Sequence, residues 1–267
     1  MTLRFVSLGS GSRGNASLIE FGSTLLMVDC GLPCKVVEER LEAVGRQPRD
    51  VTAVLVTHEH TDHAQGVALF TKRHNTPVWM TPGTASALPT ITRVHHLSSH
   101  RELKIGGISV QPYPVPHDAR EPCQFTFAAG GRRLGMLTDA GHVTPHMLER
   151  LTACDALALE CNHDLDSLQR GPYPDSLKAR VSSRFGHLNN HQTTELLRRL
   201  DANRLRARVA LHHLARPRGR AGVANGPEGK RTQEGPRAIR GGQDSARGLV
   251  GDDTAFSTAF VDQRLDP

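Results

Sequence analysis

The chain has 267 residues, of which 37% are hydrophobic and 4% aromatic, and its formal charge is +6 at pH 7. This length can bury a full core and is long enough for one large α/β domain. The mild basic charge permits a polyanionic partner without requiring one, because a generally arginine-rich protein would carry the same charge. No apolar stretch is long enough to span a bilayer, which excludes an integral helical membrane protein.

The five cysteines form no CxxC pair, and Cys30 and Cys34 are separated by three residues. The first residues enter a strand pattern directly and lack the apolar region of a secretory leader. An odd number of cysteines without such a leader favours reduced thiols. We therefore expect a cytoplasmic protein with no membrane association.

Three strands are predicted at the start of the chain, over residues 3–8, 16–21 and 24–28, the last two forming a hairpin. The Gly/Ser-rich loop between the first two contains Ser12 and Asn15, which are our candidates for binding substrate. Backbone N–H groups of such a loop can hold a phosphate, although a tight turn explains the same residues. After the strands, a helix is predicted between Pro33 and Gly45.

The next predicted strand, residues 51–56, is apolar and leads directly into the segment T-H-E-H-T-D-H. In that segment His58 and His60 are two residues apart and share a face of an extended chain, whereas Asp62 and His63 fall where the chain turns. This arrangement suits two metal ions, one held by neutral imidazoles and one by a mixed set of carboxylates and imidazoles. A polar, histidine-rich turn without metal is the weaker alternative.

Strands and helices continue to alternate along the rest of the chain. The patterns predict helices over residues 63–74, 82–88, 177–184 and 192–200, and strands over residues 77–80, 108–115, 124–129, 133–138, 155–159 and 207–211. Several strands are followed by His or Asp at or near their C-terminal ends. Such an order fits an α/β sandwich with its functional site along one edge of the sheets, and the two strand-rich halves suggest an internal repeat.

Charge and composition change towards the C-terminus. Between residues 178 and 208, Lys and Arg outnumber Asp and Glu by eight to two. A solvated helix face and a contact with a phosphate backbone explain this equally well. Beyond residue 216, Gly, Arg and Pro dominate and apolar periodicity is absent until residues 254–261, so we expect a poorly packed segment.

The pattern H-x-H-x-D-H after a strand is similar to the signature of the metallo-β-lactamase superfamily of binuclear metallohydrolases. Four further stretches resemble its YycJ/WalJ-type branch of bacterial 5′-to-3′ exonucleases on double-stranded DNA: residues 7–15, 160–164, 171–174 and 186–190. The resemblance covers residues 1–214 and implies a four-layer αββα sandwich. Residues 215–267 resemble nothing in the family, and we interpret them as a divergent or frameshifted tail that is poorly ordered.

The resemblance also implies two metal sites that share one carboxylate. The first ion would be held by His58, His60 and His117, the second by Asp62, His63 and His213, with Asp139 bridging. His213 is chosen because Leu follows it, and His212 is the alternative. The implied catalytic residues are Asp62 and His187, and the substrate-binding candidates are Ser12, Asn15, His163, His187 and Asn190. His163 and His187 could instead support the metal ligands.

The expected cofactors are two divalent ions, Zn²⁺ or Mn²⁺, because histidine and aspartate accept either metal. Such a pair lowers the pKa of a shared water and stabilises charge on a phosphodiester during attack. We therefore predict a metal-dependent phosphodiesterase that acts on DNA as an exonuclease. A thioester or lactone hydrolase of the glyoxalase II type is one alternative. A binding protein impaired by the altered C-terminus is the other.

Overall fold

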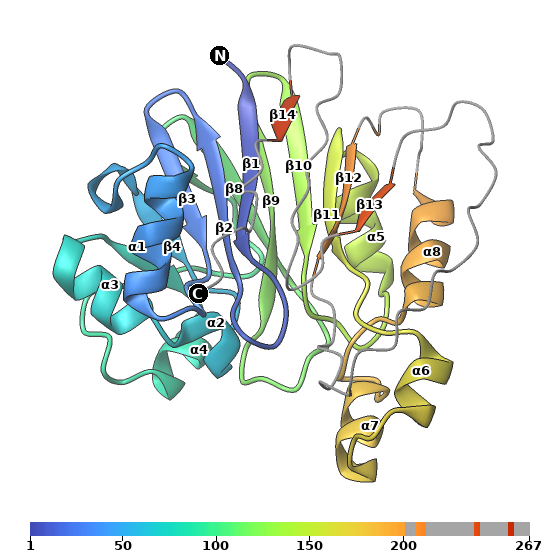
Figure 1. The fold of residues 1–267 in the computed structure, drawn as a ribbon. Coiled ribbons are helices and arrows are strands. Elements are labelled where there is room, and N and C mark those ends of the chain that lie inside the picture. The colour runs from blue at the N-terminus through green and yellow to red at the C-terminus, as the bar shows by residue number, and fades with distance from the viewer. Residues whose placement is uncertain (201–204, 206, 212–237, 241–255, 259–267) are drawn as a thin grey trace.

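Two mixed β-sheets lie face to face in the computed structural model, which describes residues 1–200, 205, 207–211, 238–240 and 256–258 (Figure 1). The first sheet has the order β14-β1-β2-β3-β4-β5-β6 and the second β13-β12-β11-β10-β9-β8-β7. In the first sheet the strands are β1 (Leu3–Gly9), β2 (Ala16–Phe21), β3 (Thr24–Val28), β4 (Ala53–Leu55), β5 (Val78–Met80), β6 (Val94–His96) and β14 (Phe256–Thr258). The second sheet contains β7 (Leu103–Ile105), β8 (Ile108–Pro114), β9 (Cys123–Ala129), β10 (Arg132–Leu137), β11 (Ala156–Glu160), β12 (Ala207–Leu211) and β13 (Ala238–Arg240).

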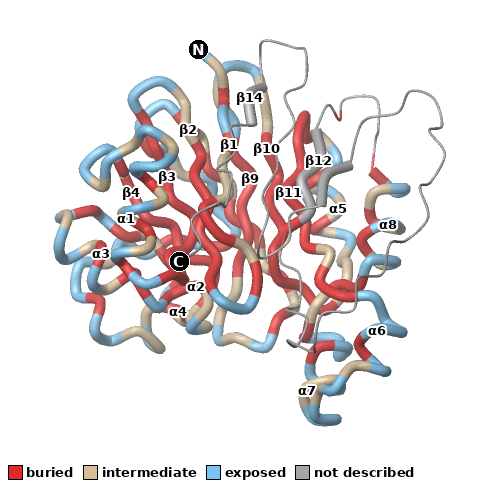
Figure 2. The backbone as a smooth tube through the Cα atoms, viewed as in Figure 1, coloured by how far each residue is buried: buried red, intermediate tan, exposed pale blue. Residues whose placement is uncertain are grey.

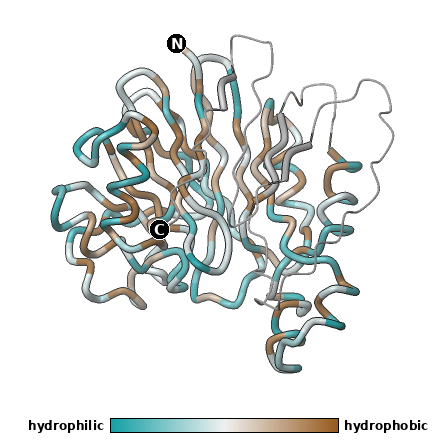
Figure 3. Tube along the Cα trace, in the orientation of Figure 1, coloured by the Kyte–Doolittle hydropathy of each residue, from teal (hydrophilic) through white to brown (hydrophobic). Residues whose placement is uncertain are grey.

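The core between the sheets is made by alternate residues of the strands, since successive side chains point to opposite faces. Phe5 and Leu26 of the first sheet join Phe125, Phe127 and Met136 of the second in one buried cluster. All five side chains are at most 3% exposed. The strands accordingly form the buried centre of the molecule and carry its most apolar segments (Figures 2 and 3).

Helices cover the outer face of each sheet and complete four layers. On the first sheet these are α1 (Cys34–Ala43), α3 (Val67–His74) and α4 (Pro82–Ala87), and on the second α5 (Pro145–Thr152) and α8 (Asn190–Arg199). Leu41 and Phe70 pack against Met27 and Val54 outside the first sheet. On the other side, Met147, Leu151 and Leu196 pack against Leu137 and Leu157. The αββα sandwich predicted from the sequence is therefore confirmed.

The single helix predicted over residues 63–74 is wrong, because the chain forms two helices, α2 (Thr61–Ala64) and α3. They are separated at Gly66, whose N–H donates to the carbonyl of Cys30 at 2.7 Å. A Cβ atom at this position would lie 2.3 Å from the carbonyl oxygen of Leu32, so only glycine allows this approach. The contact anchors the turn that carries Asp62 and His63 to the loop after β3. Several elements had no counterpart in the sequence prediction, among them β6, β7, α5, α6 (Leu165–Arg170) and a short 3-10 helix, Pro48–Asp50.

Most of the C-terminal segment falls outside the described residues, and with it the predicted boundary at residue 214 and the ligand candidates His212 and His213. Two short strands of this segment are described. β14 pairs in parallel with β1, and β13 pairs in parallel with β12. No helix in the described part of the chain is long and apolar enough to cross a bilayer.

The C-terminal ends of five strands meet at one edge of the sandwich. Each of these strands places a polar residue at this edge. Asp29, His58, His117 and Asp139 lie in the connections after β3, β4, β8 and β10, in that order, and Glu160 is the last residue of β11. The two sheets are joined at this edge, because the N–H of Cys123 in β9 donates to the carbonyl of Thr57 after β4 at 3.0 Å. Residues far apart in sequence are thereby brought together, as expected for a site at the ends of the strands.

Candidate metal centre

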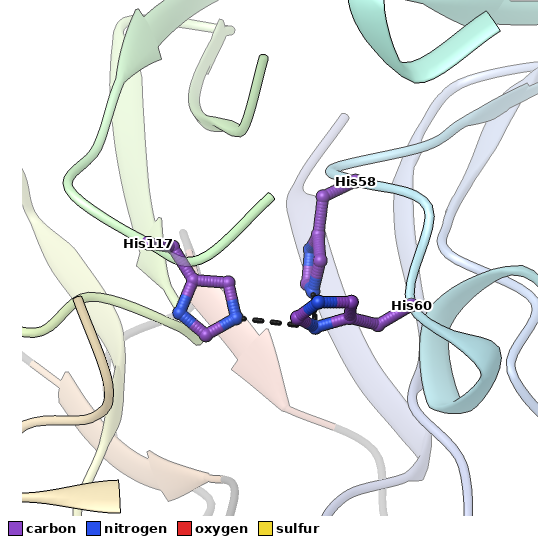
Figure 4. A group of neighbouring side chains, drawn as sticks. All are labelled: His58, His60 and His117. Atoms are coloured by element: carbon purple, nitrogen blue, oxygen red, sulfur yellow. Dashed lines mark hydrogen bonds between the residues drawn. The ribbon is translucent and has the colours of Figure 1, made fainter. Parts of the chain in front are cut away.

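Three histidine rings converge at the sheet edge and come from two separate connections (Figure 4). Nδ1 of His60 lies 3.0 Å from Nε2 of His58 and 3.3 Å from Nε2 of His117. Burial lowers the pKa of all three imidazoles, which favours the neutral form that binds a metal. The three histidines expected to hold the first ion therefore lie close together in the fold.

The second ring nitrogen of each of these histidines faces an oxygen atom. The pairs are His58 Nδ1 with Thr57 Oγ1 at 2.9 Å, His60 Nε2 with the Asp118 carbonyl at 3.2 Å, and His117 Nδ1 with the Gly186 carbonyl at 3.0 Å. Hydrogen bonds of this kind fix the tautomer and the orientation of a metal-binding imidazole. The ring nitrogens that face one another are thus oriented so that they can bind a cation.

His63 faces a second group of ligands. Its Nε2 lies 3.2 Å from Oδ2 of Asp139 and 3.8 Å from Oδ2 of Asp62, and its Nδ1 lies 2.8 Å from Oδ2 of Asp29. Burial alone would lower the pKa of His63, but Asp139 and Asp29 outweigh it and raise that pKa to about 10. The carboxylates therefore create a site for positive charge, which a proton or a metal ion can supply.

Asp139 is also close to His187. Its Oδ1 lies 3.3 Å from Nδ1 of His187, and the same nitrogen is 3.1 Å from Oε2 of Glu160. Oε1 of Glu160 accepts hydrogen bonds from the N–H groups of Ala140 and Leu188, at 2.7 and 3.2 Å. Glu160 is fully buried, which raises its pKa. It joins three segments around the centre: the loop after β10, the end of β11 and the loop before α8.

Three overlapping sets of possible ligands result within the described residues: His58, His60 and His117; His58, His63 and Asp139; and His117, Asp139 and His187. Ligand atoms within each set lie within 4.8 Å of one another. Neutral imidazoles combined with carboxylates are a donor set that suits divalent transition metals. The donors at this centre therefore fit divalent metal, and Asp139 is common to two of the three sets.

Five of the seven predicted ligands belong to these sets, and Asp62 lies beside them, with its Oδ2 3.8 Å from Nε2 of His63. His213 lies outside the described residues. Asp62 is the outermost of the six, with a side chain that is 28% exposed. Glu59 of the same motif points elsewhere, as expected, and its Oε1 accepts a hydrogen bond from the N–H of Arg120 at 2.8 Å.

A cleft of about 420 Å³ opens over the centre. His60, Asp62, Asp139 and His187 line one part of it, and other lining residues are Ser12, Arg13, Tyr173 and Arg180. The predicted catalytic residues Asp62 and His187 and the predicted substrate contact Ser12 are therefore accessible from the same space.

Asn15, another predicted substrate contact, is 5% exposed and makes contacts within the protein. Its Nδ2 lies 3.1 Å from the Asp62 carbonyl and 3.0 Å from Nε2 of His63, and its Oδ1 accepts from the Gly11 N–H at 2.8 Å. It therefore ties the Gly/Ser loop to the turn that carries Asp62 and His63.

The two remaining candidates lie beside each other. His163 is 6% exposed, and burial lowers its pKa to about 4. Its Nε2 is buried and has no hydrogen-bond partner within the described residues. Asn190 is exposed at the start of α8, and its N–H donates to the His163 carbonyl at 2.9 Å. Neither residue lines the cleft described above.

Sequence reasoning missed the supporting roles of Asp29, Thr57 and Glu160. Asp29 follows β3 and Glu160 ends β11, so their places at strand ends were the available signal. Asp29 accepts from both the N–H and the hydroxyl of Thr57, at 2.8 and 3.0 Å. It therefore supports His63 directly and His58 through Thr57.

Comparison with known proteins agrees with this geometry. Residues 24–213 match a family model described as a beta-lactamase superfamily domain. The chain belongs to this superfamily. Within it, the exodeoxyribonuclease WalJ of Streptococcus pneumoniae serotype 2 is 31% identical over 221 residues, 80% of this chain and 82% of that protein. The exodeoxyribonuclease YycJ of Bacillus anthracis is 34% identical over 196 residues, 71% and 74% of the two chains. The predicted resemblance to the YycJ/WalJ branch is confirmed.

Solved structures support the fold of this superfamily member. The metallo-β-lactamase fold protein YhfI from Bacillus subtilis has a TM-score of 0.62 at 16% identity, covering 82% of this chain and 88% of that one. Zn²⁺-bound PqqB from Methylobacterium extorquens has a TM-score of 0.59 at 17% identity, covering 79% and 89%. The family match and the two exodeoxyribonuclease relatives identify the chain as a hydrolase, whereas the solved structures show its fold.

Proposed function

We propose that this chain is a binuclear metal-dependent phosphodiesterase that degrades DNA as a 5′-to-3′ exonuclease. The position of Asp139 is the observation that carries the proposal, because its carboxylate belongs to two of the three ligand sets. A carboxylate shared in this way suits a pair of ions at one centre. The two relatives named exodeoxyribonucleases support DNA as the substrate.

In this proposal His58, His60 and His117 would hold one ion, Asp62, His63 and His213 would hold the other, and Asp139 would contribute to both. The ions are Zn²⁺ or Mn²⁺, which when bound activate a water and neutralise charge on the phosphate. Asp29, Thr57 and the Gly186 carbonyl keep the imidazoles oriented. Residues 1–214 form the catalytic domain, and the protein acts in the cytoplasm.

We assign the protonation of the leaving oxygen to His187. Of the two candidates, His187 and His163, only His187 lines the cleft. Glu160, 3.1 Å from Nδ1 of His187, holds the ring in one orientation. Ser12 at the rim of the cleft is the candidate for contacting the substrate backbone, and Asn15, His163 and Asn190 support the loops around it.

Purified protein loaded with Mn²⁺ or Zn²⁺ tests the proposal against three substrates: duplex DNA labelled at either end, lactoylglutathione and a bis-aryl phosphodiester. We expect two metal equivalents per chain by mass spectrometry and release of nucleotides from the 5′ end. Asp139→Asn should lose most of this activity together with part of the metal. Glu59→Gln, which alters a carboxylate of the same motif that does not face the ligands, is the control. Turnover of the thioester alone would overturn the proposal.

A further inference from the structure

Arg180 lies at the cleft over the metal centre and has no role in the chemistry described so far. It belongs to α7 (Asp175–Val181), and its side chain is 55% exposed. It lines the cleft together with His60, Asp62 and His187. Its guanidinium is therefore available to a molecule that reaches the metal ligands.

The backbone of α7 is fixed against the metal centre through Gly186. The N–H of His187 donates to the Val181 carbonyl at 2.9 Å, and the Gly186 carbonyl lies 3.0 Å from Nδ1 of His117. A Cβ atom at position 186 would lie 2.3 Å from the Arg180 carbonyl oxygen, so a larger residue would push the helix away. The start of the Arg180 side chain is consequently held at a fixed place relative to His117.

Asp118 then orients the guanidinium. Its Oδ2 accepts a hydrogen bond from Nε of Arg180 at 2.6 Å. Its other oxygen, Oδ1, lies 3.4 Å from Nε2 of His117 and 3.8 Å from Nε2 of His60. The ion pair therefore stands directly beside the first group of metal ligands.

This geometry leaves most of the guanidinium unused. Of its five N–H donors only the one on Nε is engaged, and the terminal Nη groups have no partner within the described residues. A planar fork of this kind binds two oxygens of a phosphate at once, which a lysine cannot do. The neighbouring part of the cleft carries the carboxylates of Asp62, Asp118 and Asp139, so a substrate phosphate needs cationic groups there.

We propose that Arg180 is a phosphate-binding residue of this centre and that Asp118 is the residue that positions it. The inference rests on the proposed function and deepens it. The ligand is a phosphate of the DNA backbone, either the one that is cleaved or the terminal 5′-phosphate beside it. Arg180 contributes to substrate binding, whereas the metal ions and their ligands carry out the cleavage.

The test compares metal-loaded wild-type protein with Arg180→Gln and Arg184→Gln. Arg184 is the matched control, because it is exposed, lies four residues further on and does not line the cleft. We expect Arg180→Gln to raise KM and the Kd for phosphorothioate-capped duplex DNA about tenfold or more, since a charge-assisted hydrogen bond is lost. It should retain the wild-type metal content and nearly the wild-type kcat. Asp118→Asn should raise KM less, because the guanidinium remains but is no longer held.

Duplex DNA that carries either a phosphate or a hydroxyl at its 5′ end distinguishes which of the two phosphates Arg180 binds. If Arg180 binds the terminal group, wild-type protein prefers 5′-phosphorylated over 5′-hydroxyl duplex and Arg180→Gln loses the preference. If it binds the cleaved phosphate, the variant raises KM equally for both ends. Either result supports a phosphate-binding role. An unchanged KM and Kd in Arg180→Gln, or an equal loss in Arg184→Gln, overturns it.

Binding of inorganic phosphate, measured by calorimetry, separates this inference from the proposed function. Wild-type protein that binds phosphate more tightly than Arg180→Gln but does not cleave DNA refutes the nuclease and supports the phosphate site. DNA cleavage and phosphate binding that are both unaffected by Arg180→Gln refute the phosphate site and support the nuclease.

Discussion

Oδ2 of Asp29 lies 2.8 Å from Nδ1 of His63, and the two side chains are only 3% and 1% exposed. Asp29 directly follows β3, and His63 lies in α2, in the connection after the neighbouring parallel strand β4. The carboxylate fixes the imidazole so that its Nε2 faces Asp139 and Asp62. A residue outside the metal motif therefore decides whether His63 can act as a ligand.

Replacement of Asp29 by Asn should weaken binding of one metal ion about 10- to 100-fold, because the charged acceptor behind His63 is removed. Asn suits the backbone at this position, where φ is 60°, since Asn tolerates the left-handed region better than most residues. The fold should therefore survive the change. Competition with a chromophoric chelator measures the affinity of each ion.

Thr57→Val provides the comparison for Asp29→Asn. Thr57 Oγ1 lies 2.9 Å from Nδ1 of His58 and 3.4 Å from Nδ1 of His63, so its loss should weaken the ion held by His58 more than the ion held by His63. If both variants weakened the same ion to the same extent, the separate supporting roles assigned to Asp29 and Thr57 would be wrong.

Removal of metal by a chelator should lower the midpoint of thermal unfolding by about 10 to 20 °C. When the free concentration of an ion is 100 times its Kd, its binding adds about 2.7 kcal/mol to the free energy of unfolding. For a domain of this size, 1 kcal/mol corresponds to a shift of about 2–4 °C in the midpoint. The metal-free protein should nevertheless stay folded, because the three hydrophobic clusters do not depend on the ligands. Calorimetry with and without chelator measures the shift, and added Zn²⁺ or Mn²⁺ should reverse it. An unchanged midpoint would mean that these residues bind no ion in solution.

The central part of the site was predictable because its ligands are local in sequence. His58, His60, Asp62 and His63 occupy a single turn after one strand, and their spacing alone determines how they can face a cation. The predicted strands also located the edge of the sandwich. Both kinds of sequence pattern, the alternation of apolar and polar residues and the continuous apolar runs, correspond to strands in the structure.

The supporting residues could not be found in the same way, because their roles depend on which strands become neighbours. A polar residue after a strand, such as Asp29, has the same local pattern as an ordinary turn residue. It meets His63 only because β3 pairs with β4. Glu160 and Arg180 likewise acquire their partners across 27 and 62 positions of the chain, distances that no periodicity reports.

Gly31→Ala should destabilise the protein by about 1–3 kcal/mol and also reduce its metal affinity. A Cβ atom at position 31 would lie 1.7 Å from the Asp62 carbonyl oxygen and 2.7 Å from the His63 nitrogen, so the turn that carries both ligands must move. Denaturant unfolding of the metal-free protein measures the first effect, and metal titration the second. In Gly107→Ala the nearest atom is Phe21 Cδ1 at 3.2 Å, at the end of a side chain that can shift. That control should therefore cost less than about 1 kcal/mol.

Glu38→Gln should lower stability at neutral pH but not near pH 2. Glu38 lies on α1, where its Oε1 accepts from Nε2 of His74 at 2.8 Å and from Arg73 at 2.9 Å, both on α3. These hydrogen bonds, that from His74 first, lower the pKa of Glu38 from 4.5 to about 2. A carboxyl whose pKa is lowered in the folded state stabilises the fold at pH values above its pKa in the unfolded state. This contribution is lost as the pH falls from about 4.5 to about 2. Because the pair is partly exposed, we expect a difference of about 0.5–1 kcal/mol at pH 7 in denaturant unfolding.

Glu39→Gln, whose partner Lys35 is 3.8 Å away and 84% exposed, should change stability much less. A Glu38→Gln deficit that stayed constant down to pH 2 would assign the effect to packing instead of charge.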